Sequence, residues 1–364
     1  MPNTLYRQAA FISIIVVALM AAACSTGKTS ASTSTTVGGS VKGTWTASLP
    51  TDLVGGLTDV SCSSPNNCIA VGGDGTGAGR AIGSTDGGVT WIASPLPDAM
   101  GTLFGVACLS NGNCIAVGNY SGVLRGTLGG SWTSVVVTGV TNLADVSCAA
   151  LLDCLAVGNG IGGGPIAISS TDGGATWTTL PPPSGVQQFS SVRCTTPTMC
   201  LATGTNDGNG QILRTTDGGS AWSAQAAPGK MTPTGTSCWN GGSDCVVVGS
   251  PSNVCSESGP VNCANAGAAY STDGGISWTL SATGSEGGGV ACPAAGECFA
   301  PAGSGIEASS DGGRTWNPQM IPSSPSGLAA LAAVSCTATS NCVAVGGYRS
   351  SPMTASIVHY SAPS

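Results

Sequence analysis

Apolar residues along this chain occur in short runs bounded by glycine, serine and asparagine, and they do not recur at the spacing of an amphipathic helix. The clearest run is Cys-Ile-Ala-Val-Gly (68–72), which is rich in strand-forming residues. The stretch 327–336 resembles a helix in composition, but its place in the repeat described below makes it the entry to a strand. The pattern therefore predicts an all-β chain of short strands joined by frequent turns.

A cysteine motif containing this run returns seven times. Its copies span residues 60–72, 106–118, 146–158, 192–204, 236–249, 290–303 and 334–346. The leading cysteines are 40 to 54 residues apart, which is the period of a four-stranded propeller blade. In the first repeat we expect strands near 57–62, 68–72, 80–85 and 90–94. The sequence therefore predicts one seven-bladed β-propeller with four antiparallel strands per blade.

A second motif, Ser-Thr-Asp-Gly-Gly-x-Thr-Trp in its fullest form, lies between the third and fourth predicted strands. We call its five copies the aspartate turns; they span residues 84–91, 170–177, 215–222, 271–278 and 309–316. The second repeat has a shorter version without the aspartate (126–132). Because glycine tolerates backbone angles that other residues resist, and aspartate accepts bonds from nearby N–H groups, the motif predicts a tight turn.

The two ends of the repeated region complement each other. Residues 355–364 supply a third strand of the seventh repeat with no fourth strand after it, whereas 43–50 carries Trp45 in the position that Trp91 has in the first repeat. We expect the N-terminal strand to complete the last blade. An open solenoid is the alternative, but it would leave exposed sheet edges.

The cysteines that follow Cys24 form eight neighbouring pairs. They are Cys62/Cys68, Cys108/Cys114, Cys148/Cys154, Cys194/Cys200, Cys238/Cys245, Cys255/Cys263, Cys292/Cys298 and Cys336/Cys342. In an exported protein such spacing predicts disulfides, each across the connection between the first and second strands. Metal binding is the alternative, but zinc sites use closer cysteines, and the chain has one histidine, His359. We expect no bound metal.

The N-terminus reads as a lipoprotein-type signal peptide over residues 1–23. Arg7 precedes an apolar run that is too short for a comfortable membrane span and that ends in small residues before Cys24. Cys24 is the predicted lipidation site, and ordinary cleavage near Ala23 is the alternative. Residues 24–40 form a Ser/Thr/Gly tether, and 41–364 form the propeller domain. This organisation places the protein on the outer face of a bacterial cytoplasmic membrane or, without the lipid, in the medium.

Charge narrows the class of partner. Only 7% of the residues are charged, and the chain without its signal peptide has nine basic and 17 acidic residues, a net charge of −8. Nucleic acids and anionic lipids bind clustered Lys and Arg, which the sequence lacks. We therefore expect an extracellular protein or glycan as partner, no nucleic acid, membrane contact through Cys24 alone, no cofactor, and a monomer.

The aspartate turns resemble the Asp-boxes of the BNR β-propellers. That pattern, Ser-x-Asp-x-Gly-x-Thr-Trp, is met at Ser84, Asp86, Gly88, Thr90 and Trp91. The resemblance covers about residues 43–361. The family that the turns resemble includes sialidases, two-propeller xyloglucan hydrolases, sorting-receptor ectodomains and the photosystem II assembly factor group. It implies that the turns lie on the face away from the binding site and that their aspartates are structural. These are Asp86, Asp172, Asp217, Asp273 and Asp311. The convergent arginines of a sialidase are missing.

The opposite face is formed by the loops between strands two and three and between blades. We consider three carboxylates there as candidate catalytic groups: Asp74, Asp207 and Glu286. Candidate ligand-binding residues are Tyr120, Asn206, Asn209, Tyr348 and Arg349. The first hypothesis is a non-catalytic, lipid-anchored binding propeller. The alternative is a glycoside hydrolase, sialidase-like or other, which would need two carboxylates about 5 to 10 Å apart in a concave centre.

Overall fold

The computed structural model describes residues 43–48, 55–97, 100–120, 122–250, 267–281, 287–321, 330–348 and 354–361. The predicted signal peptide, the tether and Cys24 lie outside these residues, as do Cys255 and Cys263 of the eighth cysteine pair. In the described ranges, no helix is long and apolar enough to cross a membrane.

The described residues form seven four-stranded antiparallel sheets, as predicted. Blade 1 contains β2 (Gly56–Cys62), β3 (Cys68–Gly73), β4 (Gly79–Ser84) and β5 (Ile92–Ala93). Blade 2 contains β6 (Leu103–Cys108), β7 (Asn113–Gly118), β8 (Val123–Thr127) and β9 (Thr133–Val135). Blade 3 contains β10 (Val140–Cys148), β11 (Cys154–Gly160), β12 (Pro165–Ser170) and β13 (Thr178–Thr179). Blade 4 contains β14 (Gln188–Cys194), β15 (Cys200–Asn206), β16 (Asn209–Thr215) and β17 (Ser223–Ala226).

The remaining three blades follow the same order, apart from the last. Blade 5 contains β18 (Thr232–Trp239), β19 (Asp244–Ser250), β20 (Ala268–Ser271) and β21 (Thr279–Leu280). Blade 6 contains β22 (Ala291–Ala294), β23 (Glu297–Ala302), β24 (Gly305–Ser309) and β25 (Asn317–Gln319). Blade 7 contains β26 (Leu331–Ala338), β27 (Asn341–Tyr348), β28 (Thr354–Ser361) and β1 (Thr44–Ser48). The described helical structure is limited to two 3₁₀ turns, Pro228–Lys230 and Asn240–Gly242.

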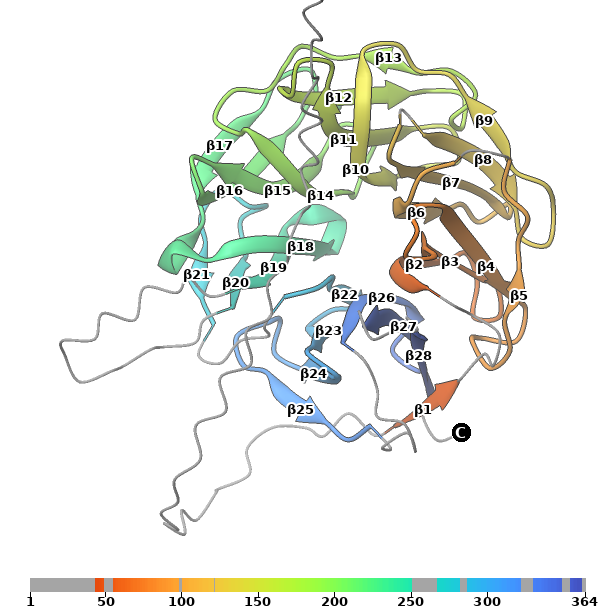
Figure 1. Ribbon diagram of the computed structural model, residues 1–364. Coiled ribbons are helices and arrows are strands. Elements are labelled where there is room, and N and C mark those ends of the chain that lie inside the picture. The colour runs from red at the N-terminus through yellow and green to blue at the C-terminus, as the bar shows by residue number, and fades with distance from the viewer. Residues whose placement is uncertain are drawn as a thin grey trace, which may run out of the picture. The chain divides into compact units, whose positions relative to one another are not determined.

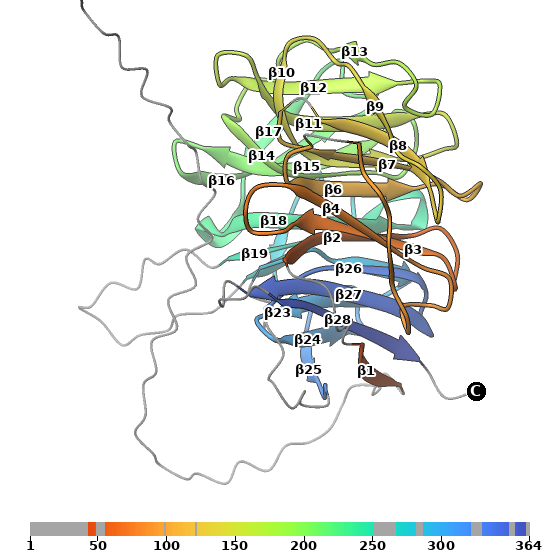
Figure 2. The same ribbon diagram turned by 45° about the vertical axis from the view of Figure 1, so that its right-hand side comes forward.

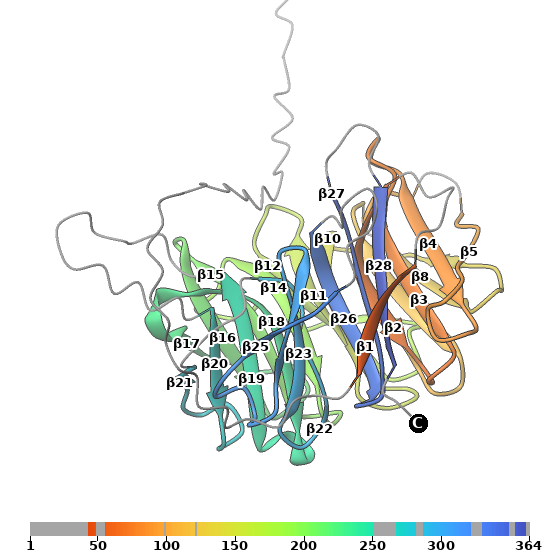
Figure 3. The same ribbon diagram turned by 90° about the horizontal axis from the view of Figure 1, so that it is seen from below.

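The blades form a closed ring, with the first strand of each blade around the centre and the fourth at the rim (Figure 1). The N-terminal strand β1 pairs with β28, with Trp45 opposite Tyr360, so both ends of the domain share one sheet. Figures 2 and 3 show β1 beside β28 from two further directions. The predicted closure by the N-terminal strand is therefore confirmed.

Apolar side chains are buried between the blades. The described residues form seven hydrophobic clusters, one at each junction, and each contains a tryptophan from the blade that follows in the ring. At the junction of blades 7 and 1, for example, Trp91 packs with Ile82 and Val343. Trp239, which does not belong to an aspartate turn, also packs against the cluster between blades 5 and 6. The ring is thus stabilised by contacts between successive sheets.

In six of the seven blades, a close backbone approach requires the glycine that ends the second-strand run. A Cβ on Gly72 would lie 2.0 Å from the carbonyl oxygen of Gly56, and the equivalent glycines of five other blades show 2.1 to 2.2 Å. The approach coincides with a β-bulge in the first strand, between Leu57 and Asp59 in blade 1. The bulge directs the next side chain, Asp59, away from the regular alternation of the strand.

The described residues contain seven disulfides, each joining the first and second strands of one blade. In six of them the two cysteines lie directly opposite each other in the strand register. The pairs are those expected from spacing: Cys62–Cys68, Cys108–Cys114, Cys148–Cys154, Cys194–Cys200, Cys238–Cys245, Cys292–Cys298 and Cys336–Cys342. Disulfides of this kind form and persist in oxidising compartments.

Candidate binding face

The disulfide hairpins and the aspartate turns lie on the same face of the ring. In each of five blades, a glycine N–H of the aspartate turn donates to a carbonyl of the cysteine hairpin in the same blade. These bonds run from Gly87 to Asn66, Gly173 to Leu152, Gly218 to Thr198, Gly274 to Ser243, and Gly312 to Gly296. Because the strands are antiparallel, the loops between strands two and three and between blades form the opposite face, which we call the open face.

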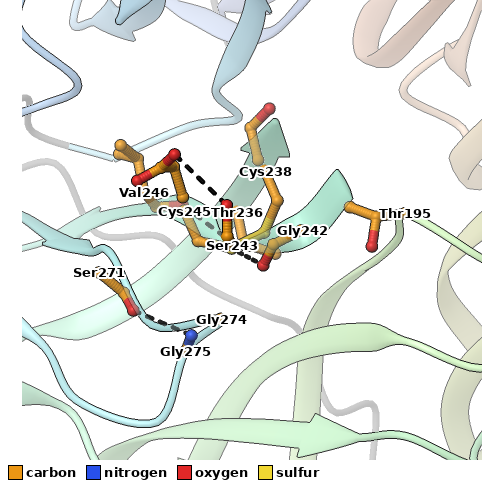
Figure 4. The surroundings of a disulfide bond; sticks show 12 residues. Thr195, Thr236, Cys238, Gly242, Ser243, Cys245, Val246, Ser271, Gly274 and Gly275 are labelled. Atoms are coloured by element: carbon orange, nitrogen blue, oxygen red, sulfur yellow. Dashed lines mark hydrogen bonds between the residues drawn. A yellow bond between two sulfur atoms is a disulfide. The ribbon is translucent and has the colours of Figure 1, made fainter. Parts of the chain in front are cut away.

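The aspartate turns are closed hydrogen-bond networks. In the first, the Ser84 hydroxyl donates to Asp86 (2.8 Å) and accepts from the Gly88 N–H (2.8 Å). Asp86 also accepts from the N–H of Thr90 (2.9 Å), and the Trp91 indole donates to the Gly88 carbonyl (3.0 Å). Figure 4 shows the same hydroxyl bond in blade 5, from Gly275 to Ser271, near the Cys238–Cys245 disulfide.

Hydrogen bonds within the turns stabilise the ionised carboxylates. The hydroxyl and backbone N–H of Thr176 lower the pKa of Asp172 to about 2, and Ser277 lowers that of Asp273 to about 2 in the same way. At Asp86, burial opposes the shift, but the bonds from its turn outweigh burial and the pKa is still lowered. A carboxylate held in this state is a poor proton donor near neutral pH, which fits a structural role.

On the open face, Asp74 organises its own loop. Its Oδ1 accepts the Thr76 hydroxyl (2.7 Å), the Thr76 N–H (2.9 Å) and the Ala78 N–H (3.2 Å). Arg80 lies 3.6 Å from its other oxygen. The Thr76 hydroxyl, with these N–H groups and Arg80, lowers the pKa of Asp74. Its acceptor capacity is therefore used within the loop.

Asp207 occupies a hairpin turn of blade 4 between Asn206 and Asn209. Its φ is +48°, a left-handed conformation that aspartate tolerates. Its carboxylate accepts from the Gln187 amide (2.7 Å), while its N–H donates to the oxygen of that amide (3.0 Å). Asn209 donates to the Asp207 carbonyl (3.2 Å). Asp74 and Asp207 thus belong to separate local networks in blades 1 and 4, and the structure does not bring them together.

Among the other predicted open-face residues, Tyr120 presents a large exposed side chain. It has a φ of +59° and is 80% exposed, with its ring lying over Gly101. Glu286 and Arg349 lie outside the described residues, and the side chain of Tyr348 is also not described.

Two more exposed apolar side chains lie on neighbouring open-face loops, Val136 (88%) and Ile161 (78%). These loops are joined by a bridge between Asn119 and Asn142 and by a bond from the Ile161 N–H to the Gly139 carbonyl (3.0 Å). The described residues of the three loops (119–122, 136–142 and 159–165) carry no charged side chain. We call this surface, at blades 2 and 3, the neutral rim.

His359 contacts a buried hydroxyl of the closing strand β1. Its Nδ1 lies 3.0 Å from the Ser48 hydroxyl, but that hydroxyl is buried and donates to the Gly88 carbonyl (2.8 Å). Burial lowers the pKa of His359, and the neighbouring Asp86 opposes this shift. The group joins β1 and β28 to the first aspartate turn.

The innermost strands of the ring carry a group of charged residues that sequence analysis missed. Asp59 and Asp145 follow the bulges of β2 and β10, and Arg193 is an exposed residue of β14. The aspartate precedes Val-Ser-Cys in these two repeats alone, whereas other repeats have glycine, serine or alanine there. The bulge that points this position at the next blade could not be read from the sequence. No described group of three or more His, Cys, Asp or Glu could hold a metal ion.

Comparison with known proteins supports the fold. No family model and no curated protein matches the sequence. Among solved structures, YCF48 bound to D1 peptide is similar, with a TM-score of 0.62 and 15% identity over 88% of this chain and 97% of that chain. The WD40 repeats of RRP9 give a TM-score of 0.63 and 12% identity over 90% and 99%. An ancestral GH74 enzyme, AFV00434, gives 0.51 and 18% over 72% of this chain and 37% of that one. At these identities the likenesses establish the β-propeller fold.

Proposed function

We propose that this protein is a non-catalytic binding propeller whose neutral rim recognises another protein. The main observation in support is that Tyr120, Val136 and Ile161 are exposed on adjoining loops without charged side chains. Exposed apolar side chains on adjoining loops are typical of contact surfaces, and tyrosine is enriched where binding energy is concentrated. The neutral setting favours a partner segment that is itself apolar and uncharged.

One structural neighbour supports this mode of recognition. YCF48 is described with a bound D1 peptide, so a propeller of similar fold can hold a segment of another protein. At 15% sequence identity, this likeness does not indicate which peptide the present chain would bind. A protein segment is nevertheless the class of partner that both the rim chemistry and the fold favour over a glycan.

The described carboxylates favour binding over glycoside hydrolysis. A hydrolase would need two carboxylates about 5 to 10 Å apart across a substrate. Asp74 and Asp207 instead satisfy the N–H and amide groups of their own loops. Glu286 lies outside the described residues.

The proposal includes export and anchoring. The seven disulfides indicate an oxidising environment. In this proposal Cys24 carries the lipid, residues 24–40 separate the propeller from the membrane, and the aspartate turns are Asp-boxes of the BNR type. The open face is then available to partners outside the cell.

A peptide-display selection tests the function. Displayed peptides that bind the wild-type propeller should include apolar, uncharged segments. Replacing Tyr120 and Ile161 with serine should weaken their binding by roughly tenfold or more, because two exposed anchors are removed. Affinities can be measured by biolayer interferometry with the purified propeller.

The matched control replaces Val89 and Ile276 with serine. These side chains are 52% and 65% exposed on the aspartate-turn face, so the control also removes two exposed apolar side chains, but from the opposite face. The control should bind the peptides as the wild type does. Equal loss in both variants, or hydrolysis of a polysaccharide that Asp74→Asn or Asp207→Asn abolishes, would contradict the proposal.

A further inference from the structure

Two carboxylates on the innermost strands link pairs of blades. Asp59 of blade 1 accepts the N–H of Val60 (2.8 Å) and, with its other oxygen, the N–H of Val106 in blade 2 (2.8 Å). Asp145 of blade 3 repeats the arrangement: it accepts from Val146 (2.7 Å) and from Val192 in blade 4 (2.8 Å). Each carboxylate is half-buried and uses both oxygens to join two sheets.

The two carboxylates lie on either side of the same stretch of β6. Asp59 accepts from Val106, while a Cβ on the preceding residue, Gly105, would lie 2.8 Å from Oδ1 of Asp145. The absence of a side chain at Gly105 therefore leaves room for the second carboxylate close to the first. Two neighbouring carboxylates that are both partly buried are costly when both are ionised.

Few other ionisable groups face this pair. Among the described residues of the strands packed against β2 and β10, Arg193 is the permanently charged group, and its positive charge acts on both carboxylates. The remaining ionisable groups on those strands are on β27 and β28. His359 is bonded to Ser48 and Tyr360 is buried against Trp45; of Tyr348 the side chain is not described.

The balance of these effects favours the protonated acids. Burial is the largest effect on Asp59, repulsion by Asp145 adds to it, and together they outweigh the N–H bonds and Arg193, raising the pKa of Asp59 to about 7. Burial likewise raises the pKa of Asp145 to about 6, opposed first by Arg193. Near neutral pH the pair therefore retains a proton that ordinary aspartates have lost.

We propose that Asp59 and Asp145 form a proton-linked clasp, which makes the closed ring more stable as the surroundings become mildly acidic. The clasp is separate from the neutral rim and does not depend on the proposed binding function. In the unfolded chain both aspartates ionise near pH 4, whereas in the ring they ionise near pH 6 to 7. The ring therefore binds more protons than the unfolded chain between those values. Its stability is greatest at the acidic end of this window and is lost as pH rises through it.

Urea unfolding of the oxidised protein between pH 5 and pH 8 tests the clasp. The unfolding equilibrium constant should fall at least about tenfold from pH 7 to pH 5. Each proton that the folded ring binds beyond those bound by the unfolded chain changes this constant about tenfold per pH unit. Asp59→Asn should remove most of this dependence. Arg193→Gln removes the positive charge, so the loss of stability should move to higher pH.

Infrared spectroscopy in deuterated buffer observes the proton directly. The wild type should show the C=O band of a protonated carboxyl that titrates near neutral pH, and Asp59→Asn should reduce it. Asp207→Asn is the matched control: it removes an exposed carboxylate from a turn that asparagine also favours, and should leave both the band and the pH dependence unchanged.

The infrared measurement on the wild type and the Arg193→Gln variant decide the question even if Asp59→Asn does not fold. Arg193 is exposed and joins no described interblade hydrogen bond, so its replacement leaves the ring intact. A wild type with no protonated carboxyl between pH 5 and pH 7 would overturn the proposal. So would stability that rises from pH 5 to pH 8, or an Arg193→Gln variant whose pH dependence matches the wild type.

Discussion

Each aspartate turn depends on a hydroxyl that is more deeply buried than the aspartate itself. Ser84, Ser170, Thr215, Ser271 and Ser309 expose between 1 and 3% of their surface. Each hydroxyl accepts an N–H from the second glycine of its turn and donates to the aspartate. The sequence draws attention to the aspartate because it is charged, but the hydroxyl satisfies the buried backbone group.

Ser84→Ala should therefore destabilise the fold. The Gly88 N–H, which is buried against blade 7, would lose its partner, at a cost of about 1 to 3 kcal/mol. Urea unfolding at neutral pH measures the loss. Thr85→Ala is the control, since that neighbouring side chain is exposed, and it should change stability little. An equal loss in the two variants would mean that the hydroxyl bond is not what holds the turn.

The cysteine hairpin is the element that the sequence predicts best. It recurs seven times at a regular spacing, and the short reach between paired cysteines leaves few alternatives to a disulfide across neighbouring strands. The fourth strands are equally well marked by their tryptophans.

The roles of the loop carboxylates were harder to predict. Asp74 and Asp207 look free in the sequence, and only the structure shows that the Thr76 hydroxyl and the Gln187 amide donate hydrogen bonds to them. The proximity of Asp59 and Asp145 depends on the packing of β2, β6 and β10 from three blades, which no local pattern encodes.

Removing one disulfide should weaken the ring without changing its architecture. A variant with Cys148→Ala and Cys154→Ala releases a closed loop of a few residues, and the chain-entropy model gives a loss of about 2 kcal/mol. The strand ladder of β10 and β11 remains to hold the hairpin. Urea unfolding of the variant and the wild type under oxidising conditions measures the difference. Non-reducing peptide mapping should recover the other six described pairs unchanged, and any exchanged pairing would contradict the assignment.

The junctions between blades are reinforced in two alternating ways. Between blades 1 and 2 and between 3 and 4, the contacts lie between the innermost strands, where Asp59 and Asp145 accept N–H groups of the following blade. Between blades 2 and 3 and between 4 and 5, an arginine of the third strand instead donates to the next aspartate turn. Arg125 bonds Gly173 and Arg214 bonds Gly274, both at 2.8 Å. These four successive junctions therefore alternate between a carboxylate contact and an arginine contact.

The junction of blades 6 and 7 differs from these, because it includes the N-terminal strand and is filled by aromatic rings. Trp45 is 1% exposed and packs 5.2 Å from Tyr360 and 6.0 Å from Phe299, measured between ring centroids. Trp45→Ala should cost about 3 to 5 kcal/mol. Because β1 covers the edge of β28, detachment of β1 in this variant should also expose that strand edge and promote association between protein molecules.

Hydrogen exchange separates loss of closure from general loss of stability. In Trp45→Ala, amides of β1 and β28 should exchange faster than those of blade 3 under conditions where the ring remains folded. Trp316→Ala is the matched control: Trp316 is 3% exposed at the junction of blades 5 and 6, so its removal should affect that junction and leave β1 and β28 protected. Uniform acceleration across all blades in Trp45→Ala would show that the N-terminal strand does not act as a separate closing element.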